Sequence, residues 1–147
     1  MDNACFILEL QSTPEEVMRA VERLQQFCRE QGVAEKAIHA LMLSLEEMAS
    51  NVVNHAYQRD PSQCFRVSVQ NRGDRIVVEL RDRGPAFDPL QVPDPALEEE
   101  DEDRAEGGWG IQLVRHSMDD LHYVREDGEN VLRMSKHSKP QTPSPGL

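Results

Sequence analysis

Two stretches of alternating apolar and polar residues, separated by three residues, constrain the fold of this chain more than any other feature. Residues 64–71 (CFRVSVQN) and 75–82 (RIVVELRD) alternate with period two around the triplet RGD, which predicts a β-hairpin. Residues 121–127 and 130–137 repeat this pattern around an Asp-Gly pair, so a second hairpin is expected near the C-terminus. Hairpins pair their strands antiparallel. The pattern therefore argues against a doubly wound parallel sheet, in which a helix separates successive strands.

The segments with helical periodicity are grouped together instead of alternating with the strands. The first is expected to start at Pro14, because Ser12 or Thr13 can cap it and proline suits a first turn. Gly32 ends it. Two further helices are expected at about 34–57 and 110–118, and one further strand at 5–10. This order predicts an α+β fold, a two-layer sandwich of helices packed on a sheet.

The acidic composition excludes some classes of partner. The chain has 147 residues and a net charge of −11, which argues against binding to nucleic acid or to an anionic membrane surface. We expect one domain over residues 1–137 and a disordered tail over 138–147. No apolar run approaches the roughly 20 residues of a membrane span, and no signal peptide opens the chain, so a cytoplasmic protein is expected.

The three cysteines, Cys5, Cys28 and Cys64, lie among apolar neighbours and are expected to be buried free thiols.

Much of the negative charge lies in one segment. Residues 89–107 hold eight acidic residues and a single basic one, Arg104, so this segment carries −7 of the net charge. It contains too few apolar residues to offset the entropy cost of ordering, so a mobile loop or a short, weak helix is expected. A glycine-containing turn lies on each side, DRG at 82–84 and GGWG at 107–110.

Polar residues share one face of the second predicted helix. Glu47, Asn51 and His55 are spaced four residues apart, and Asn54 lies beside them. This stripe is either functional or a solvated polar face, which most helices have. Asparagine favours the functional interpretation, because its side chain competes with the backbone and lowers helix propensity.

The two glycine turns also permit two interpretations each. A carboxylate at Asp82 can accept a hydrogen bond from a ligand amine, with Gly84 allowing close approach, but Asp and Gly are also expected in an ordinary turn. Residues 107–114 (GGWGIQLV) place backbone N–H groups at a helix N-terminus, where a phosphate can bind. The alternative is a flexible exit from the acidic loop.

Taken together, the order and spacing of these motifs resemble the GHKL ATPases, the superfamily that includes gyrase, MutL and histidine kinases. Glu47 with Asn51 is similar to the N box, Asp82-x-Gly84 to the first glycine box, and Gly108-x-Gly110 to the second. The stretches RDRGPAFDP, GGWGIQLVRHSMDDLHY and NVLRMSKH look like the anti-sigma factor serine kinases of the RsbW type. This resemblance covers about residues 5–137.

The resemblance implies an ATP-binding fold of the GHKL (Bergerat) type, with a mixed, mostly antiparallel sheet covered on one face by helices. It implies ATP and Mg²⁺ as cofactors, and a nucleotide lid at about 89–107. Asn51 would hold the Mg²⁺ that bridges the phosphates, and Glu47 would be the general base. Asp82 would accept a hydrogen bond from the adenine amino group.

The resemblance implies further ATP-binding residues. Gly84, Gly108 and Gly110 would allow close approach, and Arg104 either reaches a phosphate or remains a solvated charge. Leu113 and Val114 would belong to the core. The remaining implied ATP-binding residues are Asn54, His55, Phe87 and Ile111.

For function, the resemblance implies a serine/threonine kinase that is also an anti-sigma factor of a bacterial partner-switching system. Such a protein phosphorylates a STAS-domain anti-anti-sigma protein, captures a sigma factor and commonly forms a homodimer. One alternative is a nucleotide-binding anti-sigma module with little kinase activity, and another is a kinase of this fold that acts on STAS proteins outside sigma control. The intact Glu47 favours the kinase over the binding module.

Overall fold

The computed structural model of the chain describes residues 4–93 and 108–140. The strands are β1 (Cys5–Gln11), β2 (Cys64–Asn71), β3 (Arg75–Asp82), β4 (Asp120–Glu126) and β5 (Glu129–His137). The helices are α1 (Pro14–Glu30), α2 (Glu35–Asn51) and α3 (Gly108–Ser117), with a π-helix, η1 (Val52–Ala56), and a 3₁₀ turn, η2 (Pro89–Gln91).

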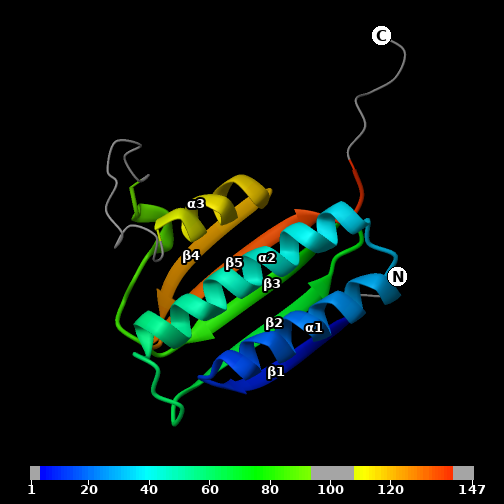
Figure 1. Cartoon of the computed structure of the whole chain (residues 1–147). Coiled ribbons are helices and arrows are strands. Elements are labelled where there is room, and N and C mark those ends of the chain that lie inside the picture. Colours follow the sequence, from blue (N-terminus) through cyan, green and yellow to red (C-terminus); the bar gives the residue numbers. More distant parts are fainter. Residues whose placement is uncertain (1–3, 94–107, 141–147) are drawn as a thin grey trace, which may run out of the picture.

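The strands form one sheet in the order β1-β2-β3-β5-β4. Both expected hairpins are present, with Val69 paired to Val78 across β2 and β3 and Tyr123 paired to Leu132 across β4 and β5. Helices α1, α2 and α3 lie together on one face of the sheet (Figure 1). The predicted α+β two-layer sandwich is confirmed, and the described strands pair antiparallel throughout, without the parallel component that a mixed sheet would add.

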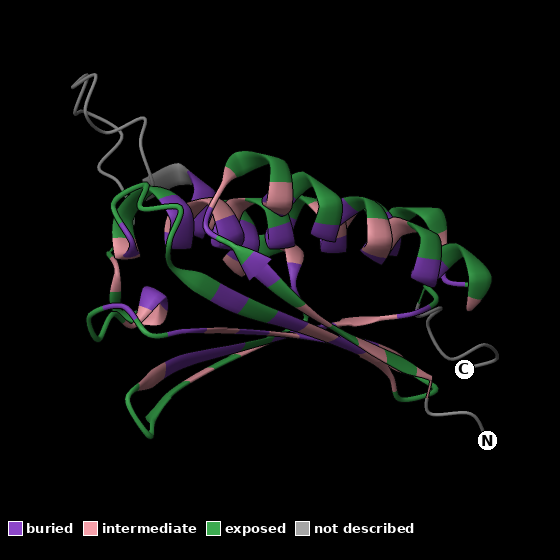
Figure 2. Cartoon of the chain, turned by 90° about the horizontal axis from the view of Figure 1, so that it is seen from below, coloured by how far each residue is buried: buried purple, intermediate pink, exposed green. Residues whose placement is uncertain are grey.

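Alternation along the strands decides which side chains face the helices. On β3, Ile76, Val78 and Leu80 are buried in the core cluster, whereas Glu79 and Arg81 lie on the opposite face of the sheet. Buried residues of the helices lie on the sides that face the sheet (Figure 2). Full burial stabilises an aliphatic side chain by about 1.5–3 kcal/mol, so this layer is the main source of stability. The buried residues of α2 are Ala37, Ile38, Leu41, Ser44, Leu45, Met48 and Ala49.

The ends of α1 follow its local sequence. Thr13 is the N-cap, and its side-chain hydroxyl accepts a hydrogen bond from the Glu16 backbone N–H at 3.2 Å. Pro14 occupies the first turn, where its missing N–H costs nothing. Gly32 takes a φ of +74° just beyond the helix, a conformation that glycine adopts without strain.

The second predicted helix is divided into two kinds of helix. Its α-helical part ends at Asn51, and residues Val52–Ala56 form a π-helix, in which the Tyr57 N–H bonds to the Val52 carbonyl at 2.9 Å. A π-helix is rare and occurs frequently at functional sites. The segment from Val52 to Ala56 therefore marks the end of α2 as a place to look for function.

The burial predicted for three residues is wrong. Cys28 is buried, and burial raises the pKa of its thiol to about 12, but Cys5 and Cys64 are exposed. Both belong to strands whose alternation turns them away from the helices, so apolar neighbours in sequence did not bury them. On α3, Val114 is buried as expected, whereas Leu113 is 47% exposed because it lies on the helix face opposite to Val114 and Ile111.

The described chain continues past the last predicted strand. Ser138 is buried, its N–H donates to the Asp74 carbonyl at 3.0 Å, and its carbonyl accepts from the Ala34 N–H at 2.9 Å.

Of the predicted lid, residues 89–93 are described, and the remainder, including Arg104, lies outside the described residues. The helices of residues 4–93 and 108–140 include none with the length and apolar character needed to cross a membrane.

Candidate nucleotide site

A cavity of about 500 Å³ lies where α2 and η1 end, between the last residues of β3 and the first residues of α3. Its size is in the range of small-molecule sites. Most of its wall is apolar, and the main apolar residues are Met48, Val52, Leu80, Val92, Ile111 and Leu132. A few polar side chains interrupt this wall, and these are Asn51, His55, Asp82, Tyr123 and Asn130.

Asp82 is the buried carboxylate of this cavity. It is the last residue of β3 and is 7% exposed. Its Oδ1 accepts hydrogen bonds from the Gly84 N–H at 2.9 Å and from the Asn130 side-chain amide at 3.0 Å. Among the described residues, both hydrogen bonds of Asp82 fall on Oδ1, so Oδ2 is available to a donor in the cavity. A buried carboxylate costs free energy unless it is hydrogen-bonded, and these bonds meet that need.

Gly84 is required by a close approach and not by its backbone angle. A Cβ at this position would lie 2.8 Å from Cβ of Ala56, closer than real side chains come, and a tight 3.0 Å from Oδ1 of Asp82. The turn after β3 is thus pressed against the π-helix. Arg125 fixes it from the other side by donating to the Gly84 carbonyl at 2.8 Å.

Tyr57 connects the end of the π-helix to the same turn. Its hydroxyl donates to the Cys64 carbonyl at 2.8 Å and accepts from the Arg83 N–H at 2.7 Å. Burial raises the pKa of Tyr57, so the phenol stays protonated and keeps its donor. This residue therefore joins η1, β2 and the turn after β3 at one point.

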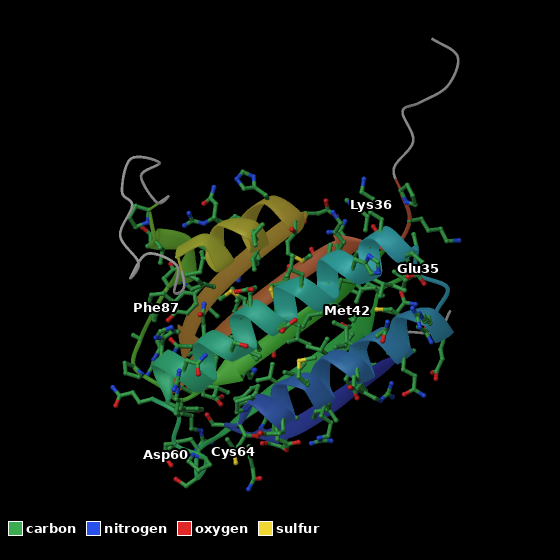
Figure 3. All side chains as sticks on the ribbon, in the orientation of Figure 1. Glu35, Lys36, Met42, Asp60, Cys64 and Phe87 are labelled. Atoms are coloured by element: carbon green, nitrogen blue, oxygen red, sulfur yellow. The ribbon has the colours of Figure 1, made fainter. Side chains whose placement is uncertain are left out.

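The structure brings together some members of the predicted polar stripe and separates another. Asn51 and His55 both line the cavity. Asn54 is exposed and outside the lining, and its side-chain oxygen accepts from Arg59 Nε at 3.3 Å. Phe87 is 50% exposed and lines the cavity from the segment after β3 (Figure 3).

Glu47 lies one helical turn before Asn51 and meets the start of α3. A Cβ on Gly110 would lie 2.2 Å from Oε2 of Glu47, so the absence of a side chain there is what admits the carboxylate. Gly108 is the first residue of α3, and Ile111 reaches the cavity from the same turn. The N-box residues and the second glycine motif, about 60 positions apart in sequence, thus meet at one edge of the cavity.

Sequence reasoning missed Asn130 and Tyr123. The Asn130 amide donates to the Pro85 carbonyl at 2.9 Å, its Oδ1 accepts from the Phe87 N–H at 3.2 Å, and Oδ1 also accepts from the Tyr123 hydroxyl. Asn130 is buried at the start of β5, directly opposite Asp82 in the strand register. Asparagine is disfavoured in strands, so its place at the start of a predicted strand, directly before Val131 and Leu132, was the signal available.

The arrangement fits an adenine nucleotide. Apolar walls suit a flat heteroaromatic ring, and the free oxygen of Asp82 suits an exocyclic amine at one end. Asn51, Glu47 and the first turn of α3 lie toward the other end, where backbone N–H groups and a helix N-terminus favour phosphates.

Comparison with known proteins agrees with this geometry. The family description "Histidine kinase-like ATPase domain" matches residues 10–136. The serine/threonine-protein kinase BtrW of Bordetella bronchiseptica is 32% identical over 102 residues, which cover 69% of this chain and 72% of that protein. The serine-protein kinase RsbW of Oceanobacillus iheyensis is 29% identical over 142 residues, which cover 93% and 89%.

A solved structure supports the fold. The RsbU and RsbW domains of a Mycobacterium tuberculosis protein align with a TM-score of 0.63 and 16% identity, over 93% of this chain and 33% of that one. The family match spans most of the chain, and the relatives agree with it. The chain therefore belongs to the histidine kinase-like ATPase domain family, within its branch of RsbW-type serine/threonine-protein kinases.

Proposed function

We propose that this protein transfers the γ-phosphoryl group of ATP to a serine or threonine of a STAS-domain anti-anti-sigma protein, and that it captures a sigma factor as an anti-sigma factor. In this proposal it acts in the cytoplasm as a homodimer. The observation that carries it is a cavity that holds the buried, hydrogen-bonded Asp82 and is also lined by Asn51 and Ile111, whose neighbours Glu47 and Gly110 meet just outside the lining.

Asp82 selects the nucleobase of the bound nucleotide. Its Oδ1 is occupied by Gly84 and Asn130, so Oδ2 is the acceptor left for the adenine amino group. A buried acceptor of this kind discriminates strongly against a base that presents a carbonyl there, because two acceptors would face each other without a proton. Guanine nucleotides are therefore expected to bind poorly.

Asn51 and the first turn of α3 hold the phosphates. Gly108 and Gly110 lack side chains, so phosphate oxygens can approach the backbone N–H groups of this turn. The amide oxygen of Asn51 lines the cavity and is a hard ligand of the type that Mg²⁺ accepts. When bound, Mg²⁺ would neutralise charge on the phosphate oxygens.

Glu47 takes the proton in the transfer. The hydroxyl oxygen of the substrate serine forms a bond to the γ-phosphorus, the bond from that phosphorus to the β,γ-bridging oxygen breaks, and ADP leaves. The hydroxyl proton passes to a carboxylate oxygen of Glu47. No hydrogen bond or ion pair occupies this carboxylate among the described residues, so it is free to accept. A positioned general base contributes roughly 10²–10⁴-fold to a rate.

The test is a phosphotransfer assay with ATP, Mg²⁺ and the STAS protein encoded nearest to this kinase in its genome. Glu47→Gln is expected to lower the transfer rate at least 100-fold while ATP still binds. Glu46→Gln is the matched control, because Glu46 is the exposed neighbour of Glu47 and its change should leave the rate within twofold. Equal rates for Glu47→Gln and wild type would remove Glu47 as the base. Absent labelling by wild type, with ATP bound and the STAS protein captured, would favour a binding module.

A further inference from the structure

All three lysines of this acidic chain surround one hollow on its surface. The chain contains Lys36, Lys136 and Lys139 and no other lysine. A hollow of about 510 Å³ is lined by all three, together with His116 and His137. It lies at the beginning of α2 and the end of β5, while the nucleotide cavity lies at the other end of α2.

The separation of the two sites can be followed along α2. Figure 3 shows Lys36 at the start of α2 and Phe87, which lines the nucleotide cavity, at the opposite end of the molecule. A 17-residue α-helix is about 25 Å long at 1.5 Å per residue. The lysine hollow, as we call the surface lined by these five basic residues, is therefore separate from the nucleotide site.

The lysine hollow keeps a net positive charge. Its acidic residue, Asp119, is already engaged, since its Oδ1 lies 3.6 Å from Lys136 Nζ and its Oδ2 accepts from the His137 N–H at 2.7 Å. Lys36 and Lys139 are exposed, and neither forms an ion pair within the described part of the chain. Two free ammonium groups thus lie at one place on a protein whose net charge is −11.

The floor of the hollow suits a peptide backbone. Ala34, Ala37 and Ala40 line it at spacings of three residues along α2. Alanines leave space for another chain to come close to the helix, and the hollow continues across to Ser117 at the end of α3. A small apolar floor with lysines around it matches an extended segment whose carboxylates point outward to the lysines.

The shape and charge of the surface favour an acidic protein segment over other anions. Lysine is a flexible point charge that pairs with carboxylates and with phosphates, so the apolar floor, which suits a peptide, is what favours a protein segment. Nucleic acid would extend beyond the hollow over a surface of the same sign, because the chain as a whole is strongly acidic. Locally concentrated positive charge raises the association rate of an acidic protein partner.

We propose that the lysine hollow is a docking site for an acidic, carboxylate-rich segment of a protein partner. The interaction does not depend on phosphoryl transfer, since the hollow and the nucleotide site lie at opposite ends of α2. Binding to the hollow is measured separately from kinase activity, so failure of one proposal is distinguishable from failure of the other.

The first test uses an octaglutamate peptide carrying an uncharged fluorophore, titrated with the full chain at low salt and followed by fluorescence anisotropy. Octaglutamate is expected to bind saturably and octaglutamine is not. The double variant Lys36→Glu/Lys139→Glu should weaken octaglutamate binding at least tenfold. The matched control, Arg66→Glu/Arg72→Glu, makes the same charge change at exposed positions of another surface and should alter affinity less than twofold. Equal weakening by both double variants, or equal binding of the two peptides, would overturn the proposal.

The second test uses the rarity of lysine. A carbodiimide couples carboxylates to amines, so octaglutamate bound in the hollow should cross-link to Lys36, Lys136 or Lys139, as located by mass spectrometry. Cross-links confined to the chain's α-amino group would contradict docking at the hollow. Inorganic phosphate that displaces the peptide far better than chloride at the same ionic strength would identify a phosphate site instead. Tighter binding of an eight-nucleotide oligothymidylate through the same lysines would identify a nucleic-acid site instead.

Discussion

Asp82 and Asn130 face each other across β3 and β5, and the Asn130 amide donates to Oδ1 of Asp82 at 3.0 Å. The same amide reaches the Pro85 carbonyl, and the Asn130 oxygen receives the Phe87 N–H. One side chain therefore orients the buried carboxylate and also fixes the backbone of the segment that follows it. Asn130 is a positioning residue, since it supports the Asp82 carboxylate, which we propose contacts the adenine ring.

Replacing Asn130 with alanine is expected to weaken ATP binding at least tenfold. The change removes one of the two hydrogen bonds to the buried Oδ1 of Asp82, and a hydrogen bond to a charged group contributes about 1.5–3 kcal/mol. It also takes this partner from the Phe87 N–H and the Pro85 carbonyl. Isothermal titration calorimetry measures the affinity, and urea unfolding measures the stability. Asn71→Ala is the matched control, because the Asn71 side chain is also hydrogen-bonded, to Gln31 at 2.8 Å, but at the far end of β2. Similar losses of ATP affinity in both variants would argue against a specific role.

Gly110→Ala is expected to impair phosphotransfer more than folding. The new methyl group would meet Oε2 of Glu47 at 2.2 Å, so the carboxylate has to move. If Glu47 is the general base that we propose, its displacement removes a large part of a roughly 10²–10⁴-fold contribution, and we expect the rate to fall at least tenfold. The melting temperature should change little, because a flexible carboxylate end can shift aside. In the Glu47→Gln background, Gly110→Ala should lower the rate much less, since residues in contact are not additive. An equal fall of the rate in both backgrounds would show that Gly110 does not act through Glu47.

Glu79 is expected to contribute stability that depends on pH. Burial acts to raise the pKa of Glu79, but hydrogen bonds from Arg81 and Arg133 outweigh it and hold the pKa below its ordinary value of 4.5. A depressed folded-state pKa means that the stabilisation is complete well above 4.5 and is lost as the pH falls through the folded-state value. Urea unfolding of wild type and Glu79→Gln should therefore differ most at pH 7 and converge in acid. A difference that stays constant from pH 7 to pH 4 would contradict this linkage.

The cysteines are expected to react in two classes. Cys28 is buried and its pKa is about 12, so almost none of it is thiolate at pH 8. Iodoacetamide should alkylate Cys5 and Cys64 in the folded protein, because both are exposed, and should reach Cys28 after unfolding in urea. Mass spectrometry of the two samples counts the modified sites. Alkylation of Cys28 at the same rate in folded protein would show that the helix layer opens readily.

The parts of the fold that depend on local chemistry were predictable. The RGD and Asp-Gly turns specify hairpins on their own, and Thr13 with Pro14 specifies a helix start, because each signal acts over a few residues. Asp82, Asn51 and the glycine motifs were selected because together they resemble the motifs of a known family, whereas each of them alone also permitted an ordinary structural interpretation. The exposure of Cys5, Cys64 and Leu113 could not be predicted, since it depends on which face of a strand or helix meets the core.

The parts of the site that depend on pairing between distant segments were not predictable. The contact of Asn130 with Asp82 requires the register of β3 against β5, 48 residues apart, and the contact of Glu47 with Gly110 requires the packing of α3. Asn54 is the opposite case, a residue implied for the site that lies outside the cavity lining. Its sequence position beside Asn51 suggested the cavity, yet the local geometry of η1 leaves it exposed beside Arg59.

The π-helix at Val52–Ala56 also determines how the end of α2 is connected to the sheet. A π turn holds one more residue than an α turn, so it acts as a one-residue spacer within the helix. If the same residues were wound as a regular α-helix, the extra residue would no longer be absorbed, and everything after it would be carried about 100° further around the helix axis. Tyr57 would then leave the Arg83 N–H and the Cys64 carbonyl that it now connects. The extra residue absorbed at this junction therefore sets the direction in which the chain leaves α2.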